Sequence, residues 1–275
     1  MSDQSLYTAC QIAIWGDQLE RGLEAASYGN IEAVELGSRQ ILPFEQTHER
    51  GKELFAKWNL TPLAVYEFGH FDSWSKRREI YLHHDRIAAL LHLLGIPNVV
   101  LGPGIRFSKK RDVQEREHQL RMVTEIAKRY QHNGISVHVH PHFGHCIFTL
   151  QDIQDLIEGA GEIIRLLPDL LHLAEARIDI PDFLSTYASY IDMIHVKDYT
   201  HRQGDRLHHH HRLTESCSMG TGDAPLQDVR AFARQLAQSS AKWLTLEYER
   251  NQPPEPEELR QDAALLHSWK ACCHE

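Results

Sequence analysis

The hydrophobic positions of this chain fall into short runs rich in Val, Ile and Leu, and each run precedes a segment with helical spacing. The eight apolar runs span residues 7–15, 31–36, 60–68, 96–102, 135–141, 163–173, 190–198 and 241–249. The expected helices follow at 17–28, 44–58, 77–94, 112–132, 150–163, 181–190, 224–238 and 255–270. Repeated strand–helix alternation implies a parallel sheet with right-handed crossovers. Eight units without an evident linker favour a closed (β/α)₈ TIM barrel over an open doubly wound sheet, so we expect one α/β domain over residues 1–275.

One connection departs from this regular alternation. Residues 199–223 form a long polar segment between the seventh strand and the seventh helix, and it contains four consecutive histidines, His208 to His211. Connections of this length are commonly lids, binding loops or disordered segments. We expect an active-site loop here, and the pattern leaves open whether the histidine run reaches the site.

Composition limits the classes of partner. With 42% hydrophobic and 24% charged residues, the 275-residue chain has the profile of a globular protein with a large core. Its net charge of −9 argues against a broad nucleic-acid-binding surface, which would need clustered Lys and Arg. A basic segment at 106–111, "RFSKKR", could hold a phosphate or carboxylate, or lie solvated in a loop.

The chain also lacks the signals of export. Its first twenty residues do not resemble a secretory leader, and no stretch reaches about 18 uninterrupted apolar residues. The five cysteines are odd in number and form no CxxC pair, so reduced thiols are expected. We therefore predict a cytoplasmic protein without a membrane segment.

The stretch "ISVHVHPHFGHCIF" at 135–148 combines a strand pattern with four histidines. Alternate residues of a barrel strand face the helices or the lumen, and the lumen side at the C-terminal strand ends forms the active site. Val137 and Val139 then face the helices, whereas His138, His140 and His142 face the lumen. The imidazoles are expected inside the mouth of the barrel.

The same parity places a metal-competent side chain at the ends of the next three strands. His195 and Lys197 face the lumen on the seventh strand, as Glu247 does on the eighth; Asp169 lies near the end of the sixth, with His172 in the following loop. The predicted ligand set is His140, Asp169, His195 and Glu247. Imidazole nitrogen with carboxylate oxygen suits Mn²⁺, Co²⁺, Zn²⁺ or Fe²⁺ better than Mg²⁺, so we expect one divalent ion.

Three further residues are candidates for substrate contact. Glu35, at the end of the second strand, could contact substrate or a water on the metal, or be a rim carboxylate in an ion pair. His70 follows the third strand and could bind substrate hydroxyls or lie in the loop without a ligand. Trp15 could form an apolar wall for a sugar ring or belong to the core.

The order of these motifs resembles the xylose isomerase-like TIM barrels, and the resemblance covers nearly the whole chain. That superfamily includes sugar isomerases and epimerases, inosose dehydratase, 3-dehydroshikimate dehydratase and endonuclease IV DNA-repair enzymes. The matching motifs are "ELGS" at 35–38, "HVHPHFG" at 138–144, "DLLH" at 169–172, "HVKD" at 195–198, "GTGDAPLQ" at 220–227 and "WLTLEYE" at 243–249.

The resemblance implies Asp169, His195 and Glu247 as metal ligands, with Glu247 also near the reacting carbon and His172 placed to bind a substrate oxygen. The fifth strand departs from the family pattern. Isomerases and epimerases of this group usually place a Glu there, which acts as ligand and as one of two acid–base groups. This chain has His140, followed by His142, and resembles inosose dehydratase more closely at that point.

This departure favours dehydration of a keto-sugar or keto-cyclitol through a metal-stabilised enediolate. An elimination needs one base, for which we choose Glu247, and an acid for the departing hydroxyl, for which His172 or His142 is suited. Lys197 is expected to bind substrate. The alternative is isomerisation or epimerisation at the same site, with His142 or Glu35 supplying the missing acid–base function.

Two other classes are less compatible with the sequence. An endonuclease IV-like phosphoesterase would need a His at the end of the fourth strand and a bridging Glu on the fifth, and the chain has "LGPG" at 101–104 and His140 there. A non-catalytic barrel would not need the retained ligand set. We expect a small polyol or sugar as substrate. Barrels of the resembled family commonly associate into homo-oligomers, but the sequence specifies neither the oligomeric state nor the substrate nor the metal.

Overall fold

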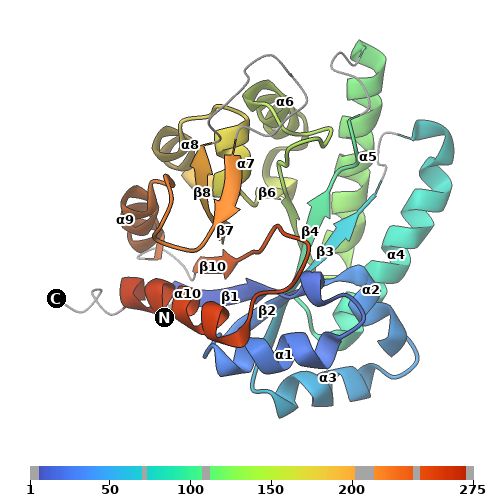
Figure 1. The fold of residues 1–275 in the computed structure, drawn as a ribbon. Coiled ribbons are helices and arrows are strands. Elements are labelled where there is room, and N and C mark those ends of the chain that lie inside the picture. Colours follow the sequence, from blue (N-terminus) through green and yellow to red (C-terminus); the bar gives the residue numbers. More distant parts are fainter. Residues whose placement is uncertain (1–5, 70–72, 107–111, 202–213, 238–241, 271–275) are drawn as a thin grey trace.

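Eight parallel strands form a nearly closed barrel in the computed structural model, which describes residues 6–69, 73–106, 112–201, 214–237 and 242–270 (Figure 1). The barrel strands are β1 Leu6–Gln11, β2 Ala33–Gly37, β3 Thr61–Phe68, β4 Asn98–Gly102, β5 Ser136–Val139, β6 Arg165–Leu166, β7 Met193–Val196 and β10 Lys242–Leu246. Their order around the barrel is β6-β5-β4-β3-β2-β1-β10-β7. Single bridges, Leu166 to Ile191 and Asp169 to His195, join the two ends of this sheet. The predicted single TIM-barrel domain is confirmed.

Helices surround the barrel (Figure 1). The α-helices are α1 Leu19–Tyr28, α2 Ser38–Ile41, α3 His48–Lys57, α4 Arg77–Leu94, α5 Val113–His132, α6 Leu150–Ala160, α7 Leu170–Glu175, α8 Ile180–Thr186, α9 Leu226–Ala237 and α10 Pro256–Lys270. Short 3₁₀ turns are η1 Ala13–Trp15, η2 Leu42–Phe44, η3 Trp74–Lys76, η4 Gly161–Ile163 and η5 Ala188–Tyr190. None of the described helices has the length and apolar composition needed to cross a membrane.

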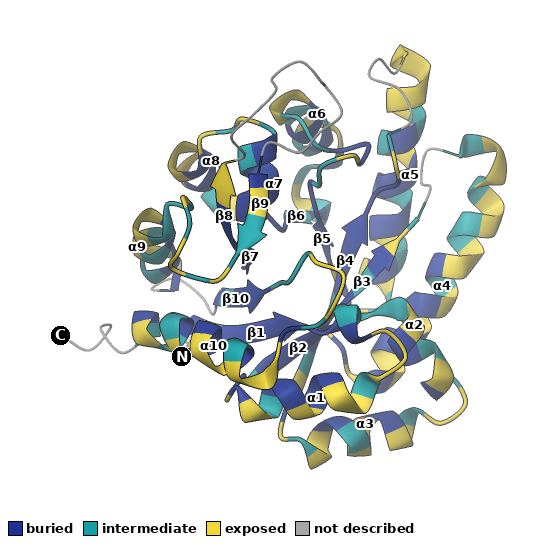
Figure 2. Ribbon diagram, viewed as in Figure 1, coloured by how far each residue is buried: buried dark blue, intermediate teal, exposed yellow. Residues whose placement is uncertain are grey.

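Two apolar clusters form the core of the protein, one inside the barrel and one between the barrel and the helices. A small cluster fills the barrel interior with Ala9, Ala33, Leu63, Ala64, Val100, Leu167 and Met193. The larger cluster lies between the strands and the helices and includes Val137, Val139, Ile194 and Val196. The predicted alternation is therefore present on β5 and β7. Figure 2 shows that most positions of the barrel strands are buried, whereas exposed positions lie on the outer faces of the helices. Hydrophobic burial on both faces of the strands holds the barrel together.

Local signals explain where several helices begin and end. Asp112 caps α5 by accepting a hydrogen bond from the Glu115 amide, and Thr149 caps α6 in the same way through Asp152. These side chains satisfy amides that have no partner within the helix. Helix α4 ends at Gly95, whose φ of 74° lies in the left-handed region that glycine adopts without strain.

The sixth strand is shorter than the sequence pattern predicted. The run 163–173 was expected to be strand, but β6 ends at Leu166 and Asp169 begins helix α7. The Asp169 carboxylate accepts a hydrogen bond of 3.0 Å from the amide of His172. His172 consequently lies in the first turn of a helix rather than in a loop, because the capping interaction outweighs the apolar strand pattern.

The long connection after β7 contains two short strands, β8 Asp198–His201 and β9 Thr214–Cys217, which pair with each other in antiparallel orientation. The Asp198 carboxylate accepts hydrogen bonds from the amides of Tyr199, Gly222 and Ala224 and so ties both ends of the connection together. The histidine run His208 to His211 lies outside the described residues.

Candidate metal centre

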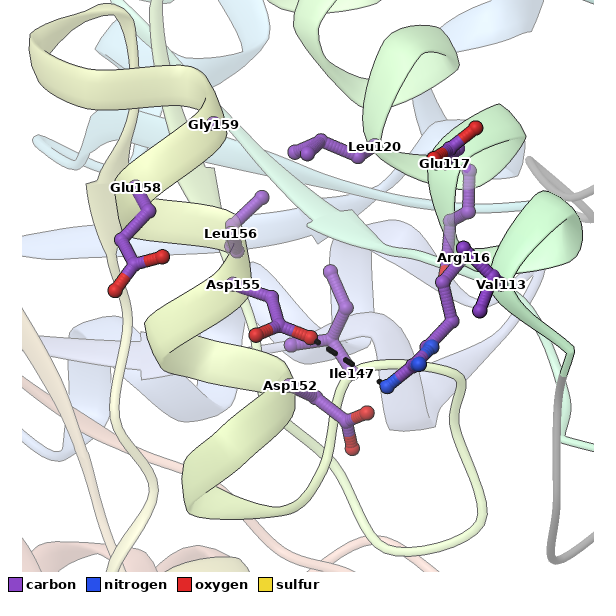
Figure 3. Close-up of a pocket in the computed structure, with 11 residues that line it drawn as sticks. Val113, Arg116, Glu117, Leu120, Ile147, Asp152, Asp155, Leu156, Glu158 and Gly159 are labelled. Carbon is purple, nitrogen blue, oxygen red and sulfur yellow. Dashed lines mark ion pairs between the residues drawn. The ribbon is translucent and has the colours of Figure 1, made fainter.

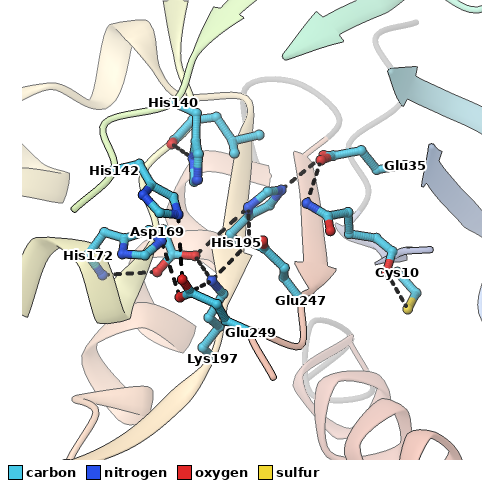
Figure 4. Close-up of polar contacts among 12 residues, drawn as sticks. Cys10, Glu35, His140, His142, Asp169, His172, His195, Lys197, Glu247 and Glu249 are labelled. Atoms are coloured by element: carbon cyan, nitrogen blue, oxygen red, sulfur yellow. Dashed lines mark hydrogen bonds and ion pairs between the residues drawn. The ribbon is translucent and has the colours of Figure 1, made fainter. Parts of the chain in front are cut away.

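Four side chains from successive strand ends converge at one mouth of the barrel. His140 follows β5, Asp169 follows β6, His195 lies on β7 and Glu247 follows β10. One ligand atom from each of them lies within 4.8 Å of all the others (Figure 4). The structure thus brings together the four residues that the sequence predicted as ligands, because each leaves its strand on the lumen side at the same end of the barrel.

Three buried atoms of this cluster, Asp169 Oδ2, His195 Nδ1 and Glu247 Oε2, lie close to one another and to the Lys197 ammonium. His195 Nδ1 lies 2.5 Å from Glu247 Oε2 and 3.9 Å from Asp169 Oδ2. Carboxylate oxygens grouped with an imidazole nitrogen form a donor set that suits a divalent cation. The residues fit a metal ion.

The outer nitrogens of the two imidazoles are held by other groups. His140 Nδ1 lies 3.1 Å from the Leu167 carbonyl, which can only accept a hydrogen bond, so His140 Nε2 is left as the ligand atom. His195 Nε2 lies 2.9 Å from Glu35 Oε2, and the amide nitrogen of Gln11 donates to the other Glu35 oxygen over 3.2 Å. Carboxylate–histidine contacts of this kind orient metal-binding imidazoles.

The protein alone places excess negative charge at the cluster. Burial disfavours a charged imidazole at His195, but the carboxylates of Glu35 and Glu247 outweigh it and raise the pKa of His195 to about 10. Burial raises the pKa of Asp169 to about 6, although Lys197 opposes the shift. A cation at this point would take the place of the proton that the carboxylates attract to His195.

Lys197 lies within the cluster. Its side chain is 1% exposed, and its ammonium lies 3.0 Å from Asp169, 3.1 Å from Glu247 and 3.4 Å from Glu249. Burial opposes the charge, but these carboxylates raise the pKa of Lys197 well above its usual value. Together with His195, Lys197 also keeps the pKa of Glu247 well below its usual range against the effect of burial. The Lys197 ammonium and the Glu247 carboxylate are therefore both charged at neutral pH.

A second group of imidazoles adjoins the cluster. His142 and His172 have ring centres 3.6 Å apart, and both lie near His140 (Figure 4). Burial, and then the neighbouring charges and imidazoles, lower the pKa of each of the three well below its usual value. The rings are therefore neutral at physiological pH.

Glu249 is a site residue that the sequence reasoning missed. Its carboxylate lies 3.6 Å from His142 Nε2 and 3.5 Å from His172 Nε2, besides the contact with Lys197. The signal was present, because Glu249 follows Glu247 by two residues and a strand pattern gives both the same parity.

The remaining predicted substrate-binding residues lie in different surroundings. Glu35 is fully buried against His195, as described above. Trp15 lies in the apolar layer between barrel and helices and packs closely against Gly22. His70 lies outside the described residues. Substrate roles for these three and for Lys197 remain predictions.

A cavity of about 440 Å³ lies on the outer surface between α5 and α6 (Figure 3). Val113 and Leu120 line one side, Leu156 and Gly159 the other, and an Arg116–Asp155 ion pair of 3.9 Å spans it. None of its lining residues belongs to the metal-competent cluster. The cavity is thus separate from the predicted metal site.

Solved structures with the same architecture include proteins of several activities. A probable 3-DHS dehydratase from Bacillus anthracis aligns with a TM-score of 0.79 and 14% identity, covering 95% of this chain and 98% of the other. D-psicose 3-epimerase from Clostridium cellulolyticum aligns with a TM-score of 0.75 and 14% identity over 96% and 98% of the chains. An IOLI protein with a bound zinc atom has a TM-score of 0.75 and 15% identity over 95% and 96%.

At such identities these similarities establish the fold alone. No curated protein matches the sequence. The model of the xylose isomerase-like TIM barrel family matches residues 23–269, which include the whole ligand cluster. The chain therefore belongs to the xylose isomerase-like TIM barrel family.

Proposed function

We propose that the protein is a divalent-metal-dependent dehydratase that acts on a keto-sugar or a keto-cyclitol. The observation that carries the proposal is the ligand cluster of His140, Asp169, His195 and Glu247, in which an imidazole occupies the position after β5. A site with one carboxylate near the reacting carbon and neutral imidazoles opposite it is suited to elimination. The structural similarity to a probable 3-DHS dehydratase supports this choice.

The four cluster residues would hold the metal, with Mn²⁺, Co²⁺ or Zn²⁺ more suitable than Mg²⁺ because two ligands are imidazoles. When bound, the ion would polarise a substrate carbonyl and stabilise negative charge on its oxygen. Lys197 would hold the carboxylates of Asp169 and Glu247 in place.

Glu247 is the group that removes the proton from the carbon next to the carbonyl. Its carboxylate is 11% exposed at the mouth of the barrel, where it can reach a proton of the substrate. His172 is better placed than His142 to donate a hydrogen bond to the departing hydroxyl. His142 Nδ1 lies 2.6 Å from the Phe143 carbonyl, which engages the only proton of its neutral ring, whereas neither ring nitrogen of His172 has a hydrogen bond.

Isomerisation or epimerisation of a sugar at the same site is the second candidate. The structural similarity to D-psicose 3-epimerase supports this candidate. A location in the cytoplasm and assembly into homo-oligomers stay predictions.

The test is a substrate panel with metal-stripped protein. Mn²⁺, Co²⁺ or Mg²⁺ would be added with keto-inositols, 3-dehydroshikimate, ketohexoses or hydroxypyruvate, and products followed by NMR in D₂O. Loss of water with a new enone or diketone signal, abolished in Glu247→Gln, is the expected result. Product of unchanged mass with solvent deuterium next to the carbonyl would support the isomerase or epimerase instead. Glu53→Gln, at an exposed position on α3, is the matched control.

A further inference from the structure

The site holds a second carboxylate, Glu249, on the side where this chain has His140 in place of the carboxylate of the family pattern. The residue after β5 is His140, so the carboxylate expected at this position is absent. Glu249 reaches the same side from the segment after β10, and its side chain is 20% exposed at the mouth. A chain segment on a different strand thus supplies a carboxylate next to the end of β5.

Lys197 links the two carboxylates of this segment. Its ammonium lies 3.1 Å from Glu247 Oε2 and 3.4 Å from Glu249 Oε2. Glu247 faces the ligand cluster, while Glu249 faces His142 and His172 (Figure 4). The two carboxylates are therefore held on either side of a fixed cation, one toward the metal-competent atoms and the other away from them.

Glu249 lies beside two imidazoles at the mouth of the barrel. His142 Nδ1 is engaged by the Phe143 carbonyl, so its neutral ring presents a lone pair at Nε2, 3.6 Å from a Glu249 oxygen. That nitrogen can accept a hydrogen bond from a substrate hydroxyl beside Glu249. His172 adds a completely buried ring whose two nitrogens both lack a hydrogen bond. These groups converge as a subsite for a polar substrate atom.

We propose that Glu249 is the second acid–base residue, which delivers a proton to the hydroxyl that leaves, while His142 and His172 position that hydroxyl. This inference rests on the proposed dehydration and reassigns the acid from the imidazoles to Glu249. Glu247 accepts the proton from the carbon next to the carbonyl. The C–O bond of the adjacent carbon breaks with its electron pair on oxygen, Glu249–COOH protonates that oxygen, and water leaves as the carbon–carbon double bond forms. Both carboxyl groups then return to their starting states by exchange with water.

The test compares Glu249→Gln with Glu255→Gln, an exposed position in the same connection. Glutamine keeps the size and hydrogen bonding of Glu249 but cannot transfer the proton. For Glu249→Gln we expect kcat of elimination to fall about 10²- to 10³-fold with a small change in KM. Its affinity for Mn²⁺, measured by calorimetry, should stay within about twofold of wild type, because Glu249 is not a ligand in this assignment.

Proton exchange separates catalysis from a structural effect. Because Glu247 is intact, Glu249→Gln should still exchange the proton next to the carbonyl, so recovered substrate gains deuterium in D₂O although little water is eliminated. The proposal would be overturned if Glu249→Gln eliminated water at the wild-type rate. It would also be overturned if the variant lost proton exchange, elimination and Mn²⁺ affinity together. If wild-type protein eliminates water from no member of the panel, the dehydratase function itself fails, and the role of Glu249 with it.

Discussion

Glu35 Oε2 lies 2.9 Å from His195 Nε2, and both side chains are fully buried. The contact leaves Nδ1 of His195 facing Asp169 and Glu247. A residue that could have contacted substrate on sequence grounds thus lies behind a candidate ligand. Which nitrogen of His195 faces the cluster is fixed by Glu35, and this gives the first prediction.

Replacing Glu35 by Gln should weaken divalent-metal binding about 10- to 100-fold, because the imidazole loses the partner that orients it and increases its basicity. Calorimetric titration of metal-stripped protein with Mn²⁺ measures the effect, with Glu53→Gln as the control. Unchanged affinity in Glu35→Gln would mean that packing alone orients His195.

Replacing Lys197 by Met should destabilise the metal-free protein by about 3–5 kcal/mol, because buried carboxylates lose the ammonium that compensates them. Added Mn²⁺ should recover more stability in this variant than in wild type, since a cation can take over part of that compensation. Urea denaturation with and without metal tests both statements, and Lys128→Met on the exposed side of α5 is the control. Equal stability of variant and wild type without metal would contradict the assignment.

His84 makes stability depend on pH. Burial, followed by His83 and Arg129, lowers the pKa of His84 from 6.5 to about 3 in the folded protein. The unfolded chain therefore binds this proton first as pH falls, so the stabilising contribution is complete above about pH 6.5 and is lost toward pH 3. Between pH 6 and 4 the loss is about 1.4 kcal/mol per pH unit.

Replacing His84 by Gln should flatten this dependence, and Gln can still hydrogen-bond Tyr130, whose hydroxyl lies 2.9 Å from His84 Nδ1. The free energy of unfolding in urea, measured from pH 7 to pH 4, gives both slopes. His132→Gln, at an exposed position of α5, should keep the wild-type slope. Parallel slopes for His84→Gln and wild type would show that His84 is not the group responsible.

Gly159 permits the close packing of α6 against α5. A Cβ added there would lie 2.2 Å from Leu120 Cδ2, a distance that no side chain can tolerate without movement. We expect Gly159→Ala to change the free energy of unfolding by less than about 1 kcal/mol, because the Leu120 methyl groups can turn into the cavity that Leu120 lines and because Ala is favoured over Gly within a helix by about 1 kcal/mol. Thermal unfolding measures the change. A loss of more than about 3 kcal/mol would show that α5 and α6 must separate instead.

The barrel and the residues that could bind a metal were both predictable from the order of residues along the chain. Eight apolar runs separated by helical segments have few ways to bury their hydrophobic faces, and strand parity places alternate side chains in the lumen. His140, Asp169, His195 and Glu247 could be chosen on that basis because each lies at or just beyond the end of a strand. The strand pattern erred at 163–173, where the local cap by Asp169 begins a helix that apolar periodicity cannot distinguish from a strand.

The groups that surround those four residues could not be predicted before the folded structure was known. Glu35 and His195 are separated by 160 residues in the sequence. Glu249, which follows the last barrel strand, contacts His142 and His172, which follow β5 and β6. Periodicity gives the face on which a side chain lies but not the direction in which it turns, nor which distant group it meets. Those contacts depend on barrel closure, which brings the first, middle and last strands to one mouth.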